Sequence, residues 1–366
     1  MSDFRFSEPL ASLPSVTPFV APEALERMRG APLEVRLGAN ESCFGIAPSA
    51  LEAMAQAAAT SYYYGDPESY ELRHALASER DVPYEGISVG SGIDDLLGLI
   101  ARAFVSPGSK VVTSLGGYPT FNYHVEGFGG VLVRAPYRPD FHNDLDALAG
   151  LAKELEPALV YLANPDNPTG TWYSPEVVRE FHRSLPTGCV LVLDEAYVDF
   201  APATTDFTPL AHERNVLRLR TFSKAHGLAG ARIGYMLADP EVVAAFDKIR
   251  HHFGVNRVAQ AGALASLRDA NFLASVTAQV IEGRREYEAL GAELGIGTVP
   301  SATNFVAFDM GSRERAEAIL KALLELGVFI RKPGAPPIDR LIRVTVGNRE
   351  DRLRFAEAFR KVVENL

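Results

Sequence analysis

The amino-acid sequence predicts an α/β protein with a large domain, in which helices flank a mostly parallel sheet, and a smaller α+β domain. Short apolar runs alternate with helical stretches as far as residue 219, which is typical of a parallel sheet covered by helices on both faces. Beyond residue 290 strands and helices follow one another in a different order. At 366 residues the chain also exceeds one ordinary hydrophobic core, so we expect two domains.

The first 39 residues are predicted to form an arm that packs with the small domain and the active site. Prolines are frequent in this stretch and interrupt regular structure, except for a short helix expected at 22–29. The rest of the chain is assigned to a large domain, 40–255, and a small domain, 256–366.

The large domain is predicted from its alternating elements. Apolar runs predict strands at 87–89, 111–113, 131–134, 159–163, 190–193 and 216–219. Helices are expected at 48–58, 70–80, 96–104, 144–155, 174–185 and 208–213. Most strands are therefore joined by helical crossovers, which gives parallel neighbours.

The last part of the chain is predicted to begin with long helices between about residues 240 and 290. The small domain then follows as strands at 304–309, 328–331 and 341–347, with helices at 313–326 and from residue 350. This order favours a separate α+β unit.

Composition excludes several classes of partner. A formal net charge of −10 and a pI near 5.4 disfavour nucleic acid or an anionic membrane as the main partner. No apolar run approaches the ~20 residues of a membrane helix, and the first residues lack a signal-peptide pattern. Cys43 and Cys189 are far apart, and His251 and His252 have no further ligands nearby, so we expect no metal and a cytoplasmic protein.

Polar runs follow three of the predicted strands directly. They are Asn-Pro-Asp-Asn-Pro-Thr-Gly at 164–170, Asp-Glu-Ala-Tyr at 194–197 and Thr-Phe-Ser-Lys at 221–224. Because ligands bind at the carboxyl ends of parallel strands, these runs predict one ligand site. A lysine among small residues at such a place is a candidate Schiff-base former, although a solvated surface lysine would be the ordinary alternative for Lys224 alone.

The residue types in these runs suit pyridoxal phosphate. This cofactor needs a lysine for its aldehyde, a carboxylate beside its pyridine nitrogen, donors to its phenolic oxygen, and amides or cations around its phosphate. The candidates in that order are Lys224, Asp194, Tyr197 with Asn167, and Ser223 with Arg232.

The chain resembles the fold-type I aminotransferases, and within them the histidinol-phosphate aminotransferase group. The resemblance rests on the runs at 164–170 and 194–200 and on Ser-Lys-Ala-His-Gly-Leu-Ala-Gly-Ala-Arg-Ile-Gly-Tyr at 223–235. It implies catalytic roles for Lys224, Asp194 and Tyr197, adds Thr221 to the cofactor site, and implies a homodimer with shared sites.

A phosphate cradle is expected at the turn after strand 87–89. Strand, glycine turn and helix start aim free main-chain amides at an anion, so Gly92, Ile93 and Asp94 are candidates for the cofactor phosphate. Turns of this kind also occur without any ligand. The family often has serine where Ile93 stands, so the main-chain amides would contribute more in this chain.

The resemblance implies three further positions near the cofactor and the substrate. Tyr64 of the partner subunit would reach the cofactor phosphate, Phe121 would stack on the pyridine ring, and the main chain near Asn40 would approach the substrate. Each has a structural alternative: Tyr64 as part of an aromatic interface cluster, Phe121 as a core residue, and Asn40 as part of a polar loop.

The substrate anion is expected at arginines of the small domain. Arg343 stands on an apolar strand, where a guanidinium is costly unless it meets an anion, and the family has its substrate arginine in this stretch. Arg331 matches a second arginine of the family. Both could instead be paired with neighbouring acids. Phe19 stands where relatives acting on histidinol phosphate tend to have tyrosine.

The resulting hypothesis is an aminotransferase that moves an amino group between an amino substrate and 2-oxoglutarate. The donor would be histidinol phosphate or, because Phe19 lacks the hydroxyl group, an aromatic amino acid. A threonine-phosphate decarboxylase shares the fold and cofactor and stays open as an alternative. A non-catalytic pyridoxal-phosphate sensor fused to DNA recognition is a third possibility, but the proline-rich N-terminus has no helix-turn-helix module.

Overall fold

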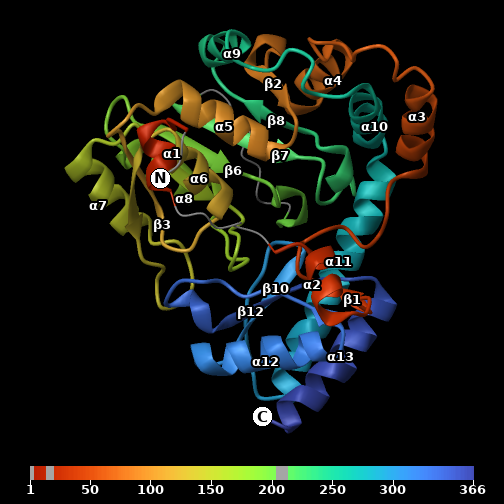
Figure 1. Cartoon of the computed structure of the whole chain (residues 1–366). Helices are drawn as coiled ribbons and strands as arrows, with labels where there is room; N and C mark the ends of the chain where they lie inside the picture. The colour runs from red at the N-terminus through yellow and green to blue at the C-terminus, as the bar shows by residue number, and fades with distance from the viewer. Residues whose placement is uncertain (1–3, 14–19, 203–212) are drawn as a thin grey trace.

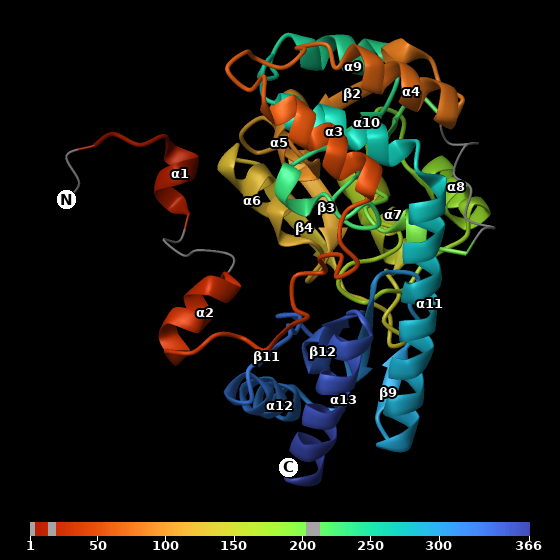
Figure 2. The ribbon, with the colours of Figure 1, turned by 90° about the vertical axis from the view of Figure 1, so that its right-hand side faces the viewer.

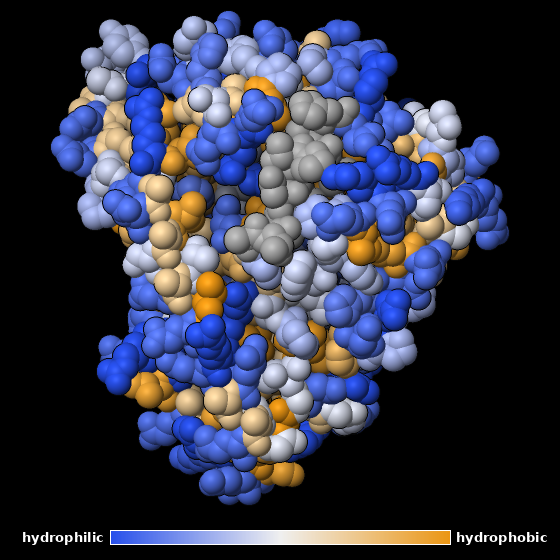
Figure 3. Space-filling model, turned by 180° about the vertical axis from the view of Figure 1, so that it is seen from behind, coloured by the Kyte–Doolittle hydropathy of each residue, from blue (hydrophilic) through white to orange (hydrophobic). Residues whose placement is uncertain are grey.

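The computed structural model describes residues 4–13, 20–202 and 213–366, and these form a large and a small domain. Figure 1 shows the small domain, in blue, below the large sheet and its helices. Seen from behind, the described surface is mostly hydrophilic, with apolar residues scattered between polar ones (Figure 3).

The large domain is built on a 7-stranded sheet with the order β2-β8-β7-β6-β5-β3-β4. Only β8 runs antiparallel to its neighbours, β2 and β7. The strands are β2 (Ile87–Gly90), β3 (Lys110–Ser114), β4 (Val131–Ala135), β5 (Leu159–Ala163), β6 (Val190–Asp194), β7 (Val216–Thr221) and β8 (Gly234–Leu237). The central strands β5, β6 and β7 are buried along nearly their whole length, as expected for a sheet covered on both faces.

Helices cover both faces of this sheet. They are α3 (Pro48–Ala58), α4 (Tyr70–Arg80), α5 (Ile93–Phe104), α6 (Pro119–Gly127), α7 (Leu145–Leu155), α8 (Pro175–Ser184), α9 (Pro240–Asp247) and α10 (Arg257–Leu267). The apolar cores on the two faces are separate: one gathers around α5 and α6, the other around α7 and α8.

The small domain has a 3-stranded antiparallel sheet in the order β12-β10-β9. Its strands are β9 (Gly297–Val299), β10 (Phe305–Asp309) and β12 (Leu341–Thr345), and its helices are α11 (Ala270–Glu293), α12 (Arg313–Glu325) and α13 (Arg349–Glu364). α13 begins with a capping box, in which Asn348 and Asp351 each bond the other's main-chain N–H.

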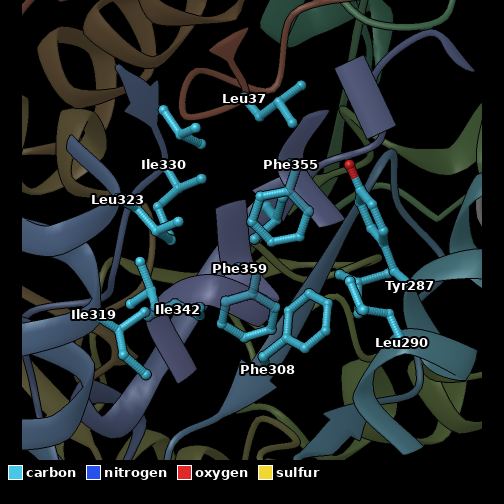
Figure 4. Packing of buried hydrophobic residues seen from close by; sticks show 14 of the residues in the cluster. Leu37, Tyr287, Leu290, Phe308, Ile319, Leu323, Ile330, Ile342, Phe355 and Phe359 are labelled. Carbon is cyan, nitrogen blue, oxygen red and sulfur yellow. The ribbon is translucent and has the colours of Figure 1, made fainter. Parts of the chain in front are cut away.

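An aromatic cluster forms the core of the small domain (Figure 4). Phe355 and Phe359, one turn apart on α13, stack with ring centroids 5.2 Å apart. Phe308 from β10 meets the Phe359 ring edge-on at 5.3 Å. Tyr287 from α11 completes the group and donates its hydroxyl hydrogen to the main-chain oxygen of Thr345 at 3.1 Å. This packing fixes β12, the strand that carries Arg343, against two helices.

The N-terminal arm lies along one side of the molecule (Figure 2). It contains α1 (Glu8–Ser12) and α2 (Pro22–Arg29), and α1 packs near α6. Farther along, β1 (Val35–Arg36) pairs in parallel with β11 (Val328–Phe329) of the small domain. The end of the arm is therefore hydrogen-bonded to the small domain at β1.

The boundary between the domains lies later than predicted. α10 packs against α3 and α4 of the large domain. α11 then runs from the large domain down into the small one in both ribbon views (Figures 1 and 2). The predicted boundary at residue 255 separates α10 from the helices on which it packs, so we place the division within α11.

Most predicted elements agree with the structure to within two residues, but several elements were not predicted. The elements that were missed are α1, β1, α6, β8 and β9; each is short, and β8 directly follows a glycine-rich loop. The strands predicted at 328–331 and 341–347 end at Phe329 and Thr345, and the helix predicted at 96–104 begins at Ile93. The predicted helix at 208–213 falls almost wholly outside the described residues.

Candidate active site

A cavity of about 830 Å³ lies between the two domains, at the carboxyl ends of β5, β6 and β7. The large domain contributes the residues that directly follow these strands, and the small domain contributes Arg343 and the segment 331–335. The polar runs at 164–170, 194–197 and 221–224 therefore meet in one place, as the strand pattern predicts.

Lys224 lies three residues beyond the end of β7 and lines this cavity. Its Nζ donates a hydrogen bond to the main-chain oxygen of Asn40 at 3.1 Å. The same nitrogen lies 5.6 Å from the centroid of the Tyr197 ring. The lysine is thus half-buried and held at the junction of the domains, unlike an ordinary solvated surface lysine.

Asp194 is the last residue of β6 and is buried at the floor of the cavity. Burial raises the pKa of its carboxyl group to about 6, although hydrogen bonds from the Tyr161 hydroxyl and the Ala196 N–H act in the opposite direction. A buried carboxylate with this environment is suited to face a cationic ligand atom.

Glu195, the next residue, is held by a buried ion cluster. Its carboxylate accepts hydrogen bonds from Arg218 Nε at 3.1 Å and from Arg220 Nε at 2.8 Å. Burial raises the pKa of Glu195, but the two guanidinium groups outweigh this effect and lower it. The end of β6 is therefore bonded to β7 by side chains as well as by the sheet.

Asn167 and Arg343 connect the two domains across the cavity. Arg343 Nη1 donates to the side-chain oxygen of Asn167, and Arg343 Nη2 donates to the main-chain oxygen of Gly38 at 3.1 Å. Burial lowers the pKa of the Arg343 guanidinium to about 10. Among the described residues it has no carboxylate partner, so the alternative of a neighbouring ion pair is not met for Arg343.

The turn that carries Asn167 is fixed by the buried carboxylate of Asp166. This group accepts hydrogen bonds from Thr169 Oγ1 at 2.7 Å, from Asn143 Nδ2 at 3.0 Å and from the Tyr137 hydroxyl at 3.2 Å. A fully hydrogen-bonded turn of this kind holds the neighbouring side chain rigidly.

The predicted phosphate cradle lies at the turn before α5, and its role stays a prediction. Gly92 has φ +86° and is followed by the N-terminus of α5, where Ile93 and Asp94 line the cavity. A Cβ atom at Gly92 would lie 2.5 Å from Arg232 Nη2, so the absence of a side chain leaves space for the guanidinium. Arg232 Nη2 lies 3.4 Å from an Asp94 carboxylate oxygen. The N-terminus of α5 and an arginine meet here, whereas the Gly92 N–H is bonded to the main-chain oxygen of Gly90 at 2.8 Å.

Thr221 and Ser223 also line the cavity. The Thr221 hydroxyl accepts a hydrogen bond from the Ser223 N–H at 3.0 Å, and both residues are buried. The Thr221 hydroxyl is therefore held by the main chain of the turn that leads to Lys224.

The prediction for Phe121 is wrong. Its side chain is 0% exposed and does not line the cavity; it stacks on Tyr161 with ring centroids 4.8 Å apart. Tyr118, three residues earlier, does line the cavity, as do Tyr123 and Tyr197, and its hydroxyl donates to Asp94 at 2.8 Å. Burial and the nearby Asp94 raise the pKa of Tyr118, which keeps its hydroxyl protonated. Tyr118 precedes the helix, whereas Phe121 lies one turn inside it and faces the core.

Of the predicted residues Tyr64, Arg331 and Phe19, only Arg331 is found at the cavity of this chain. Tyr64 is 77% exposed, stacks on Phe253 at 4.7 Å and does not line the cavity of its own chain, so its role in a partner subunit stays a prediction. Arg331 lines the cavity and donates to the main-chain oxygen of Val20 at 3.1 Å. Phe19 lies outside the described residues.

Asn40 is the most highly connected of the predicted residues. Its side-chain Nδ2 donates to the Tyr197 hydroxyl at 2.9 Å, and its main-chain oxygen accepts from Lys224 and from Asn304. The Thr345 hydroxyl group is hydrogen-bonded to the main-chain nitrogen and to the side-chain oxygen of Asn40. Thr345 was missed from the sequence, although it lies two residues after Arg343 and therefore on the same face of the strand.

No group of three or more histidine, cysteine, aspartate or glutamate side chains suited to a metal ion occurs among the described residues. Within the same part of the chain, no helix is long and apolar enough to cross a membrane.

Comparison with known proteins identifies relatives along nearly the whole chain. Residues 34–359 match the family model of aminotransferases class I and II. The chain is 40% identical over 356 residues to a histidinol-phosphate aminotransferase of Anaeromyxobacter sp. (strain Fw109-5), covering 95% of this chain and 97% of that protein. It is 32% identical to a histidinol-phosphate aminotransferase of Moorella thermoacetica, covering 99% of this chain and 97% of the other.

A solved structure is similar over the full length. It is a histidinol-phosphate aminotransferase from Sinorhizobium meliloti in complex with pyridoxal-5'-phosphate. The TM-score is 0.95 at 46% sequence identity, covering 99% of this chain and 98% of that one. The predicted α/β fold with a mostly parallel central sheet is thereby confirmed.

Proposed function

The chain belongs to the aminotransferase class I and II family, and from this premise we propose that it transfers the amino group of histidinol phosphate to 2-oxoglutarate with pyridoxal phosphate as cofactor. One observation carries the proposal: Lys224, Asp194 and Arg343 line the same cavity. An amine, a buried carboxylate and a guanidinium are the groups that the cofactor ring and an anionic substrate require.

The residues around the cavity fit the cofactor. The cradle at Gly92, with the N-terminus of α5 and Arg232, would hold the phosphate, and Asp194 would face the pyridine nitrogen. Asn167 and Tyr197 supply donors for the phenolic oxygen. When bound, pyridoxal phosphate supplies an aldehyde that condenses with amines and a ring that withdraws electrons from the amine-bearing carbon.

Tyr118 takes the place that we predicted for Phe121. Its ring lines the cavity, and its hydroxyl is tied to Asp94. We therefore assign to Tyr118 the wall against which the planar cofactor ring stacks.

Lys224 is the group that we assign to proton transfer. Its Nζ would take the proton from the amine-bearing carbon of the substrate and later return one, as general base and then acid. The Asn40 main-chain oxygen accepts from this nitrogen at 3.1 Å and so holds the free amine beside the Tyr197 ring.

Arg343 is assigned to the anionic end of the substrate, with Arg331 beside it on the same wall. The Arg343 and Arg331 main chains are bonded to each other, so the two guanidinium groups come from adjacent backbone. A phosphate monoester carries up to two negative charges, which suits a site with two arginines and no carboxylate partner for Arg343 among the described residues.

We also propose that the protein is a cytoplasmic homodimer. Tyr62, Tyr63 and Tyr64 are strongly exposed, and Phe253 stacks on Tyr64, so an aromatic patch is available for a second copy of the chain. Cys43 and Cys189 are both free thiols, which supports a reducing compartment.

The test is a set of single half-reactions. The purified, cofactor-loaded protein is mixed separately with histidinol phosphate, phenylalanine, tyrosine and glutamate, and the change in cofactor absorbance is followed. Selective and rapid conversion by histidinol phosphate would support the proposal. Preference for phenylalanine or tyrosine would make it an aromatic aminotransferase, and release of carbon dioxide without a keto product would indicate a decarboxylase.

A further inference from the structure

Thr345 connects the small domain to the predicted cofactor site through a chain of hydrogen bonds. It is the last residue of β12, is 1% exposed, and lies on the same face of the strand as Arg343. Its hydroxyl oxygen is 3.1 Å from the Asn40 main-chain nitrogen and 3.1 Å from Asn40 Oδ1. No substrate or cofactor contact is assigned to Thr345 itself.

The direction of each hydrogen bond follows from the chemistry of the groups. A main-chain N–H can only donate, so the Thr345 oxygen must accept from Asn40. The Thr345 hydroxyl hydrogen is then available for Asn40 Oδ1, which can only accept. The positions of the heavy atoms alone leave the two ends of the Asn40 amide ambiguous. With the amide reversed, the buried Thr345 hydroxyl hydrogen would have no acceptor among the described residues, so this bond favours the orientation with Oδ1 directed at Thr345.

The orientation of the Asn40 amide in turn fixes the Tyr197 hydroxyl. With Oδ1 directed at Thr345, Asn40 Nδ2 faces Tyr197 and donates to its oxygen at 2.9 Å. The Tyr197 hydrogen must therefore point away from Asn40. Tyr197 lines the cavity, and its hydroxyl hydrogen has no acceptor among the residues that the structure describes.

We propose that Thr345 is a positioning residue that, through Asn40, turns the Tyr197 hydroxyl into a hydrogen-bond donor aimed at the cofactor's phenolic oxygen. The inference rests on the proposed function, because it requires that cofactor in the cavity. Without the Thr345 hydroxyl, the Asn40 amide can rotate and present either end to Tyr197. The tyrosine would then lose its fixed direction and donate to Asn40 for part of the time.

The readout is the pH at which the visible absorbance of the cofactor-loaded enzyme changes. This change reports protonation of the Lys224 nitrogen next to the phenolic oxygen. A donor at that oxygen places positive potential there and favours the deprotonated form, so its loss raises the midpoint. Loss of one hydrogen bond to the phenolic oxygen should raise the midpoint of the absorbance change by about 0.4–1 pH units.

The charged groups around Tyr197 stay unchanged in this test. Lys224 Nζ lies 5.6 Å from the Tyr197 ring, and Arg343 interacts electrostatically with Tyr197 from the strand that also carries Thr345. Lys224 and Arg343 are not substituted in this test. A shifted midpoint would therefore be caused by the change in hydrogen bonding and not by a change in charge.

The experiment compares Thr345→Val, which has nearly the same shape without the hydroxyl, with Thr345→Ser, which keeps the hydroxyl. Tyr197→Phe and the double variant Thr345→Val/Tyr197→Phe complete the cycle. We expect Thr345→Val to raise the midpoint, Thr345→Ser to keep the wild-type value, and the double variant to match Tyr197→Phe. If Thr345→Val does not fold, Thr345→Ala removes the same hydroxyl and takes its place.

Two outcomes overturn the inference while leaving the proposed function intact. One is a wild-type midpoint in Thr345→Val, and the other is an equal shift in the presence and absence of the Tyr197 hydroxyl. A wild-type protein that binds no cofactor and shows no visible band would instead refute the proposed function, and the inference with it.

Discussion

The phenolic hydroxyl of Tyr118 donates a hydrogen bond to the Asp94 carboxylate at 2.8 Å and so ties the aromatic wall of the cavity to the start of α5. Asp94 also lies 3.4 Å from Arg232. The ring wall and the phosphate cradle are therefore one connected unit, and a change in either is expected to affect how the cofactor is held.

Replacing Tyr118 and Phe121 should separate a site residue from a core residue. Tyr118→Ala should weaken cofactor binding by about tenfold, because it removes the stacking wall. Phe121→Ala should instead lower the free energy of unfolding by about 3–5 kcal/mol, because it leaves a cavity in the core. Equilibrium dialysis and urea unfolding of both variants check this. A larger loss of cofactor affinity in folded Phe121→Ala would contradict the assignment.

Lys224→Ala should abolish turnover and the absorbance of covalently held cofactor, because no other amine is assigned to the cofactor aldehyde. The measurement is borohydride reduction of the loaded protein, followed by mass spectrometry of its peptides. Wild-type protein should carry the cofactor on Lys224. The exposed Lys248 provides the control, and Lys248→Ala should behave as wild type. Full turnover by Lys224→Ala would refute the central assignment.

Asp194 should make the stability of the cofactor-free protein depend on pH. Its folded pKa is raised from 3.8 to about 6, so the folded protein binds this proton more tightly than the unfolded chain. The ionised carboxylate therefore destabilises the apoprotein above pH 6 by about 3 kcal/mol, and this penalty fades as the pH falls from 6 towards 4.

Asp194→Asn tests this effect through melting curves of the apoprotein. The variant should be more stable than wild type at pH 8, and the difference should shrink between pH 6 and pH 4. A constant difference over this range would show that Asp194 does not titrate there. The same variant should bind the cofactor more weakly at pH 8, because it cannot balance a cationic pyridine nitrogen.

Gly227→Ala should destabilise the loop that carries Lys224. Gly227 has φ +71°, and a Cβ atom there would overlap the main-chain oxygen of Gly45. We expect the free energy of unfolding to fall by at least about 1–3 kcal/mol, because both the backbone conformation and the contact are unfavourable. Gly230→Ala in the same loop is the matched control, since a Cβ there meets nothing within 4 Å. Equal unfolding midpoints for the two variants would contradict this prediction.

Arg343→Gln should raise KM for anionic substrates by about 10- to 100-fold, because a charge-assisted contact is worth about 1.5–3 kcal/mol. The cofactor absorbance should stay unchanged. Arg340→Gln is the control, because Arg340 bonds Asp309 at the edge of the small domain and does not line the cavity. An unchanged KM in Arg343→Gln would place the substrate anion elsewhere.

The strand ends of the large domain were predictable because they are local features. An apolar run followed directly by polar residues indicates where a buried strand stops, and parallel strands bring such ends to one edge of the sheet. Lys224, Asp194 and Asn167 were found in this way. Ile93 and Arg232 were found because a glycine turn before a helix, and an arginine in a motif, are also local signals.

Contacts between distant segments were not predictable in the same way. Lys224 bonds Asn40 across 184 residues, and Thr345 bonds Asn40 across 305 residues. Side-chain spacing along a strand or helix carries no information about which segment will pack opposite it. The exchange of Phe121 for Tyr118 has a similar cause, since the packing of α6 decides that the Phe121 ring faces the core and that the Tyr118 ring, just before the helix, lines the cavity.

The sequence by itself determined the fold class, the cofactor chemistry and the residues at the strand ends, because each depends on apolar periodicity or on a short motif. Only the tertiary structure decided which aromatic ring forms the cavity wall and that Asn40 connects Lys224, Tyr197 and Thr345. The physical reason is that these choices depend on how the two domains pack, and that packing is fixed by side chains hundreds of residues apart.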